Sequence, residues 1–239
     1  MGQYTGSHKD VIAVPNPSTI DLADIFQASP RIMHPAMMDA FASGDLSSII
    51  ENPAEGIHVF PLFNEEYCKK LIEVAEATGQ FYREEGNTYA VPELRFTVIS
   101  RLLMQAYVDV ATRFILPVIE EVWRLGDHFD VFRVPFICRY STDTVTQMDR
   151  HFDAHGVLSL AVPLNAEYGG GSVFFNKQGY NNKDTPPGYA TMFPSLLTHE
   201  HEVLPVTSGI RYSMTAWINS TKADQGADES WAIHTKNTR

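Results

Sequence analysis

The feature that most constrains the fold is a series of short β-rich runs within residues 129–219. Each run is 5 to 12 residues long, and Gly, Pro, Asn and Asp separate the runs from one another. These residues favour turns and interrupt strands. The runs are residues 129–140, 156–164, 171–175, 188–193 and 210–218. Short strands at regular spacing are typical of sandwiches and jelly-roll barrels, so we predict a β-barrel core here.

The region before this core carries helical patterns. Asn64 is placed to cap a helix over residues 64–79, and Gly79 is placed to end it. Apolar residues at helical spacing predict one buried stripe on this helix: Cys68, Leu71, Ile72 and Ala75. We therefore expect a helix that packs its apolar face against the β-rich core.

A longer apolar pattern over residues 101–126 predicts a second helix, with a kink at Pro117 and its end at Gly126. Shorter segments complete the interpretation, with helices expected over 18–26 and 34–44, a strand over 56–63, and an extended or loop segment over 87–99.

The fold class predicted for the whole chain is mainly β with helical support, in a single domain. The expected parts are an irregular or helical extension (1–55), a helical support (56–128), the barrel with the functional site (129–219) and a C-terminal tail (220–239). A chain of 239 residues is long enough for one well-packed core.

Composition excludes several classes of function. The net charge of −11 disfavours general binding to nucleic acids or anionic membranes. Cys68 and Cys138 fall on predicted apolar faces and are expected to be buried, reduced thiols. The N-terminal residues lack an apolar stretch of signal-peptide length, and no run approaches a membrane span. We therefore expect a cytoplasmic protein without a membrane partner.

His151 and Asp153 are the candidate metal ligands. Residues two apart in an extended segment point to the same side, so this imidazole and this carboxylate can converge on one ion. His199 and His201, again two apart, both offer the third ligand. Two His and one carboxylate form the facial triad of non-haem Fe(II) oxygenases. His155 would face the same site if the extended segment continued, as a substrate contact, a partner of a ligand or a polar strand end.

Arg211 and Ser213 form a second candidate site, ten and twelve residues after His201. In the predicted strand 210–218 their side chains point to the same face. A buried guanidinium prefers a carboxylate held by two hydrogen bonds, and a hydroxyl can donate a third. The pattern predicts binding of a dicarboxylate that chelates the metal at one end, a description that 2-oxoglutarate fits.

The ordered set of H-x-D, a distant His and R-x-S resembles the Fe(II)/2-oxoglutarate-dependent dioxygenase superfamily. Within it, the chain most resembles the C-terminal catalytic domain of the procollagen lysyl hydroxylases, which are prolyl 4-hydroxylase-like, over about residues 57–219. The similar segments are FPLFNEEYCKKLIE, CRY, HFDAHGVLSLAVPLN, YGGGSVFF, PPGYATMFP and LTHEHEVLPVTSGIRY. The resemblance implies a double-stranded β-helix.

The resemblance also implies roles for individual residues. It selects His201 over His199 as the third iron ligand, beside His151 and Asp153, and leaves His199 a structural or supporting role. No catalytic residue is implied beyond the ligands.

For the cosubstrate, the resemblance implies that Arg211 holds the distal carboxylate of 2-oxoglutarate. Ser213 adds its hydroxyl, and Tyr140 flanks the cosubstrate pocket.

The implied activity is hydroxylation of an aliphatic C–H with release of succinate and CO₂. Its cofactors are Fe(II), 2-oxoglutarate and O₂, with ascorbate as a candidate addition. The expected substrate is a lysyl, or in second place a prolyl, side chain in a peptide. A free amino acid or natural-product intermediate is the alternative, and a non-catalytic sensor of metal or cosubstrate is a third hypothesis. The resemblance also makes a homodimer a candidate assembly.

Overall fold

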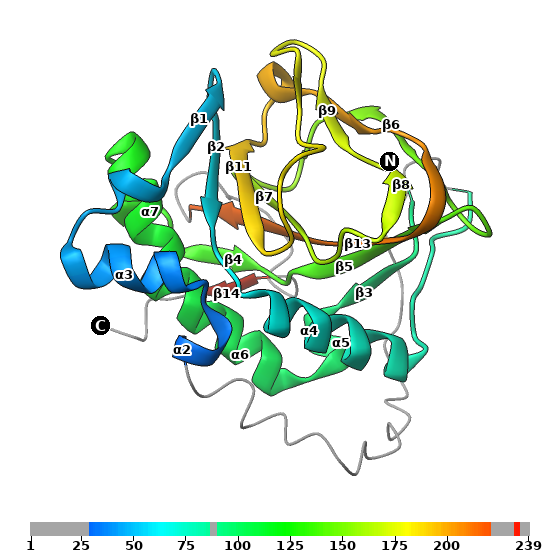
Figure 1. Cartoon of the computed structure of the whole chain (residues 1–239), viewed down its shortest axis with the longest axis horizontal. Coiled ribbons are helices and arrows are strands. Elements are labelled where there is room, and N and C mark those ends of the chain that lie inside the picture. The colour runs from blue at the N-terminus through cyan, green and yellow to red at the C-terminus, as the bar shows by residue number, and fades with distance from the viewer. Residues whose placement is uncertain (1–28, 87–89, 221–231, 235–239) are drawn as a thin grey trace.

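Two antiparallel sheets face each other and enclose the interior of a barrel (Figure 1). The structure is a computed structural model that describes residues 29–86, 90–220 and 232–234. Helices α3 to α7 lie together on one side of the barrel, against the larger sheet (Figure 1). This arrangement is the double-stranded β-helix with helical support that the sequence predicts.

The larger sheet has ten strands among the described residues. Its main path runs β1-β2-β11-β7-β13-β4-β14, while β5 pairs with β13, β3 pairs with β5, and β8 pairs with the start of β13. The strands are β1 (Glu51–Ala54), β2 (Ile57–Pro61), β3 (Glu93–Arg95), β4 (Val131–Arg133), β5 (Phe136–Ser141), β7 (Leu158–Pro163), β8 (Tyr168–Gly170), β11 (Tyr189–Pro194), β13 (Val206–Asn219) and β14 (Ala232–His234).

The smaller sheet has the order β10-β9-β12-β6. Its strands are β6 (Met148–His151), β9 (Val173–Phe175), β10 (Tyr180–Asn181) and β12 (His201–Val203). The pairing of β12 with β6 sets His201 directly opposite His151. Segments that are 50 residues apart in the sequence thus place the two imidazoles side by side.

The helices begin and end largely where local sequence signals predict. They are α2 (Ser29–Ile32), α3 (Pro35–Ser43), α4 (Glu65–Thr78), α5 (Phe96–Ile99), α6 (Arg101–Val110) and α7 (Leu116–Trp123), with short turns η1 (Ser47–Ile49), η2 (Ala111–Ile115), η3 (Gly126–His128) and η4 (Leu197–His199). The side chain of Asn64 accepts a hydrogen bond from the Tyr67 amide at 2.7 Å, and Gly79 ends α4 in the left-handed conformation. Both predicted signals of α4 are confirmed.

The long helical pattern over residues 101–126 is a helix with one irregular turn. A π-helical turn, η2, joins α6 to α7 just before Pro117. Because Pro117 has no amide hydrogen, it cannot donate the regular helical hydrogen bond to the carbonyl four residues earlier. The π-helical turn therefore lies where the sequence predicts a kink. The predicted end at Gly126 is wrong, because Arg124 already adopts the left-handed conformation (φ 57°) and ends α7.

The same run, Arg101–Trp123, is long and apolar enough to cross a membrane, contrary to the expectation that no run reaches that length. However, 56% of its most apolar window is buried inside the fold. Its buried residues pack in the same apolar cluster as the larger sheet. Burial of this kind is typical of the core helix of a globular domain.

Other expectations differ in detail from the observed elements. Within the extended segment predicted over 87–99, the described residues form strand β3 followed by the short helix α5. Strand β14 lies in the predicted tail and pairs with β4. The helix expected over 18–26 lies outside the described residues. Cys68 and Cys138 are buried free thiols, as predicted.

Candidate active site

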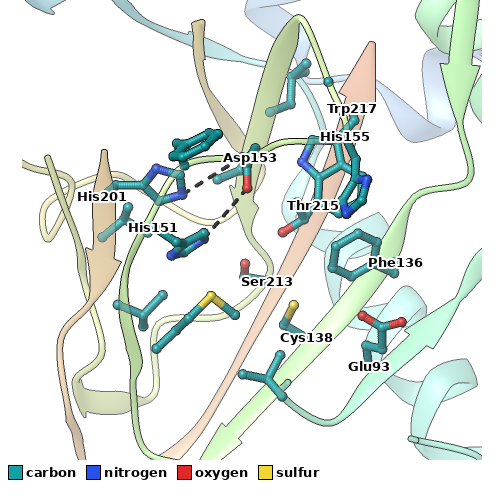
Figure 2. A pocket seen from close by; sticks show the side chains of 18 of the residues that line it. Glu93, Phe136, Cys138, His151, Asp153, His155, His201, Ser213, Thr215 and Trp217 are labelled. Carbon is teal, nitrogen blue, oxygen red and sulfur yellow. Dashed lines mark ion pairs between the residues drawn. The ribbon is translucent and has the colours of Figure 1, made fainter. Parts of the chain in front are cut away.

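Three metal-ligating side chains meet inside the barrel. One ligand atom from each of His151, Asp153 and His201 lies within 4.8 Å of the other two. The Nε2 atoms of His151 and His201 lie 3.7 and 3.9 Å from the two carboxylate oxygens of Asp153 (Figure 2). These distances exceed those of hydrogen bonds, so the three groups surround a space of the size that a metal ion needs.

The orientation of both imidazoles suits metal binding. The Nδ1 atom of His151 lies 2.8 Å from the Asp149 carbonyl, and that of His201 lies 3.0 Å from the His199 carbonyl. A carbonyl only accepts, so each Nδ1 carries the hydrogen and each Nε2 presents a lone pair. Burial lowers the pKa of His201, which favours the neutral form that ligates a metal.

Asp153 is held by serines that the sequence analysis missed. The hydroxyl of Ser159 donates to the Asp153 carboxylate at 2.6 Å and lies 2.7 Å from the Ser195 hydroxyl. All three side chains are buried. Ser159 stands inside an apolar strand, and a lone polar residue in such a run is the signal that could have identified it.

Arg211 is buried, and its Nε and Nη1 atoms have no hydrogen-bond partner among the described residues. A buried cationic group left in this state is costly, unless a ligand supplies the missing acceptors. The carbon at the centre of its guanidinium lies 5.0 Å from the centre of the Tyr140 ring. The site therefore has the chemistry to take up an anion.

Ser213 and Tyr140 stand beside Arg211 because of strand register. Arg211 faces Tyr140, and Ser213 faces Cys138, across the pairing of β13 with β5. All four side chains line the same cavity as the His–Asp–His cluster. Burial raises the pKa of Cys138 to about 12 and raises that of Tyr140, so both groups stay protonated at neutral pH. The predicted cosubstrate residues are thus brought together.

The glycine cluster, residues 169–171, allows a close approach of two backbones, because a Cβ atom on Gly170 would clash with the Pro205 carbonyl oxygen. Gly170 and Gly171 have φ angles of 72° and 69°, which favour glycine. A Cβ atom on Gly171 would lie only 2.9 Å from Cδ of Arg211 and 2.7 Å from Cγ2 of Val206. The absence of a side chain at Gly171 therefore leaves room for Arg211.

The two remaining histidines occupy different positions. His199 is buried away from the cavity, with Nε2 3.1 Å from the Glu55 carbonyl and Nδ1 3.0 Å from the Thr198 hydroxyl. His155 lies in an exposed turn, because the extended segment ends at His151. Its ring nevertheless lines the cavity, 5.4 Å from the ring of Trp217 (Figure 2).

The cavity has a volume of about 1140 Å³ and extends well beyond the cluster. Its further wall includes Glu93, Arg95, Phe136 and Trp217. Sequence reasoning had assigned no role to these four residues. The segment of Glu93 and Arg95 is predicted to be extended or a loop, but only the pairing of β3 with β5 brings it to the cavity.

The fold and the cavity suggest a class of protein, and comparison of the sequence finds similarity to the same class. Residues 124–219 match the family model of the 2OG-Fe(II) oxygenase superfamily. The predicted resemblance to Fe(II)/2-oxoglutarate-dependent oxygenases is therefore confirmed. The His–Asp–His cluster and this superfamily match also agree with the predicted cofactors, Fe(II) and 2-oxoglutarate.

Among curated proteins, the chain is similar to procollagen-lysine,2-oxoglutarate 5-dioxygenase 1 of Rattus norvegicus, with 24% identity over 209 residues, or 83% of this chain and 29% of that protein. It is also similar to the multifunctional procollagen lysine hydroxylase and glycosyltransferase of Caenorhabditis elegans, with 28% identity over 72% of this chain and 25% of that protein. The chain thus spans less than a third of the length of these relatives.

Solved structures show the same fold at low identity. A viral collagen prolyl hydroxylase of Paramecium Bursaria Chlorella virus-1, in a 2OG complex, matches with a TM-score of 0.53 and 20% identity over 70% of this chain and 97% of that one. A Pseudomonas putida prolyl-4-hydroxylase matches with a TM-score of 0.56 and 16% identity over 77% and 97% of the two chains.

Proposed function

We propose that the protein is an Fe(II)- and 2-oxoglutarate-dependent hydroxylase of an aliphatic C–H. The main observation behind the proposal is that one cavity contains both a candidate metal site and a candidate anion site. A His–Asp–His cluster with both Nε2 lone pairs turned inward shares that cavity with Arg211, a buried guanidinium with two nitrogens that lack partners in the described part of the chain. A facial triad and an anion site together suit an iron ion and a dicarboxylate cosubstrate.

His151, Asp153 and His201 would hold the iron, which with 2-oxoglutarate and O₂ supplies the oxidising chemistry when bound. The hydroxyl of Ser159 keeps the Asp153 carboxylate turned toward both imidazoles. The Asp149 carbonyl fixes the tautomer of His151 in the same way that the His199 carbonyl fixes His201.

Arg211 would bind the distal carboxylate of 2-oxoglutarate, with the Ser213 hydroxyl as an additional donor and Tyr140 beside it. The register of β13 and β5 supports this assignment, because it puts all three side chains on the cavity face of the larger sheet. Cys138 remains a neutral thiol in this pocket and adds no competing charge.

The substrate we infer is a lysyl, or in second place a prolyl, side chain in a peptide. The similar proteins support it, since they are procollagen lysine hydroxylases and a collagen prolyl hydroxylase. The cavity is larger than a cosubstrate needs, which leaves room for a side chain. A free amino acid or natural-product intermediate is the alternative. Four expectations from the sequence stay predictions. They are the homodimer, the cytoplasmic location, the single domain with its parts, and the use of ascorbate.

The test is to incubate the protein with Fe(II), 2-oxoglutarate and two panels, one of peptides containing lysine or proline and one of free amino acids. We expect succinate in amounts that match a peptide product one oxygen heavier, measured by mass spectrometry. Succinate formation only with free amino acids would replace the peptide substrate by the alternative. Absence of stimulated turnover with every compound would favour the sensor hypothesis.

A further inference from the structure

A second carboxylate reaches the cavity from the edge of the larger sheet. Glu93, on β3, lines the same cavity as the His–Asp–His cluster, and its side chain is 28% exposed. The pairing of β3 with β5 sets Glu93 opposite Cys138, and the pairing of β5 with β13 sets Cys138 opposite Ser213. Directly opposed residues share one face of a sheet, so Glu93, Cys138 and Ser213 form a row across the cavity wall.

The next row of the same face carries the partner of Glu93. Arg95 stands opposite Phe136, and Phe136 stands opposite Thr215. The Nε and Nη2 atoms of Arg95 donate to one carboxylate oxygen of Glu93, Oε1, at 3.3 and 3.2 Å. The other oxygen, Oε2, has no hydrogen-bond partner among the described residues. Arg95 thus fixes the carboxylate and leaves one oxygen for a ligand.

Arg95 compensates the negative charge of Glu93 only in part. Burial, together with the nearby Glu84 carboxylate, raises the pKa of Glu93 above its ordinary value, although Arg95 acts in the opposite direction. An additional cation beside Oε2 would stabilise the ionised carboxylate.

Aromatic side chains line the cavity next to this carboxylate. The ring of Phe136 lies 5.1 Å from that of Trp217, which in turn lies 5.4 Å from the His155 ring. Figure 2 shows Glu93 close to Phe136, with Trp217 and His155 further along, toward Asp153. An apolar aromatic wall that ends at a carboxylate suits an alkyl chain that carries a positive charge.

We propose that Glu93 is the residue that selects a cationic substrate, by accepting a hydrogen bond from a substrate ammonium at Oε2 while Arg95 holds Oε1. The inference rests on the proposed hydroxylase function and adds a specificity-determining residue to it. Phe136 and Trp217 would contact the methylene groups between the ammonium and the rest of the substrate. The ammonium belongs either to a lysyl side chain or to the α-amino group of a free amino acid.

The first experiment compares Glu93→Gln with the wild type on a capped peptide containing one internal lysine and on the same peptide with norleucine. We expect the wild type to prefer lysine by about tenfold to a hundredfold in kcat/KM, the range for a hydrogen bond between charged groups. In Glu93→Gln the preference should fall to within about threefold, chiefly through KM for the peptide, with KM for 2-oxoglutarate unchanged. Free lysine and free norleucine serve as two further substrates. If Glu93→Gln weakens turnover of free norleucine, Glu93 binds the α-ammonium of a free amino acid. If it weakens turnover of the capped lysine peptide, Glu93 binds the ammonium of the lysyl side chain.

The matched control is Glu73→Gln, which removes the same charge from an exposed ion pair with Lys70 on α4. It should leave the lysine preference unchanged. A wild-type preference that survives in Glu93→Gln, or that Glu73→Gln abolishes equally, would overturn the inference.

A binding measurement separates this inference from the proposed function. The Mn(II)- and 2-oxoglutarate-loaded protein is titrated with both capped peptides and both free amino acids by calorimetry. If the wild type prefers a cationic ligand and Glu93→Gln removes that preference, the role of Glu93 is supported. If no oxygenated product forms in that case, the proposed function fails and the role of Glu93 does not. Equal affinity of wild type and Glu93→Gln for every ligand would overturn the role of Glu93, whatever the turnover.

Discussion

The two faces of strand β13 differ in chemistry although their residues alternate along one backbone. One face lines the cavity, and its residues are Arg211, Ser213, Thr215 and Trp217. The other face packs in the apolar cluster shared with the helices, and its residues are Tyr212, Met214, Ala216 and Ile218. Successive side chains of a strand point to opposite sides, so a single segment serves both the core and the site.

The helix-facing side makes the larger contribution to stability. Met214, Ala216 and Ile218 are completely buried against apolar neighbours, which is the arrangement that stabilises a fold most. The cavity face instead holds buried polar atoms that have no hydrogen-bond partner within the described ranges, among them Nε of Arg211 and Nε1 of Trp217. A buried polar atom without a hydrogen-bond partner lowers the stability of the fold. The cavity face is therefore less stabilising, but its unpaired atoms can form hydrogen bonds with a ligand.

The largest effect on the cavity side is expected for Asp153→Ala. The substitution removes the only carboxylate of the His–Asp–His cluster, so iron binding and turnover should both be lost. A metal contribution of several kcal/mol corresponds to a loss of about a thousandfold or more in the rate of 2-oxoglutarate consumption. Iron affinity and succinate formation are the measurements.

Arg211→Ala is the companion variant, since it changes the cavity but not the cluster. It should keep metal affinity and mainly weaken 2-oxoglutarate binding. Normal iron binding and turnover in Asp153→Ala would show that the metal site lies elsewhere.

On the helix side, Met214→Ala should reduce stability and leave the chemistry intact. Truncation of a fully buried Met costs about 2–5 kcal/mol in the free energy of unfolding, whereas Ser213→Ala on the cavity face should cost less than about 1 kcal/mol. Urea denaturation monitored by circular dichroism measures both. Turnover per folded molecule should stay near the wild-type value in Met214→Ala, and equal destabilisation by the two variants would contradict the division between the faces.

Local signals were sufficient wherever a few neighbouring residues determine the outcome. The cap at Asn64 and the end at Gly79 lie within one helix, and both were predicted correctly. The convergence of His151, Asp153 and His201 could be expected because the ligand spacing is itself a sequence pattern. Alternation along residues 210–218 also placed Arg211 and Ser213 on one face.

Features that depend on pairing between distant strands could not be predicted in the same way. Nothing in the segment around Glu93 and Arg95 indicates that it lies beside Phe136, because that contact follows from the register of β3 with β5. The residues around His155 form a turn and not the extended segment expected from the sequence, although the His155 ring still lines the cavity. The sequence predicts a helix end at Gly126, yet Arg124 adopts the left-handed conformation first.

The smallest expected effect, and the finest test of the cavity face, is Gly171→Ala. A Cβ atom here would press on Cδ of Arg211 at 2.9 Å, so the guanidinium must shift from its place beside Tyr140. We expect KM for 2-oxoglutarate to rise by about tenfold, equivalent to about 1.4 kcal/mol of binding free energy, while iron affinity stays unchanged. Steady-state kinetics at saturating substrate and a metal titration measure the two quantities.

Gly179→Ala is the matched control for this variant. Gly179 has a similar φ of 63°, but a Cβ atom there would have no neighbour within 4 Å. The control therefore carries the same backbone strain, about 1–2 kcal/mol, without the contact to Arg211. If Gly179→Ala raised KM for 2-oxoglutarate as much as Gly171→Ala does, strain and not the position of Arg211 would explain the result. A rise confined to Gly171→Ala would mean that the glycine cluster keeps open the space in which Arg211 binds its anion.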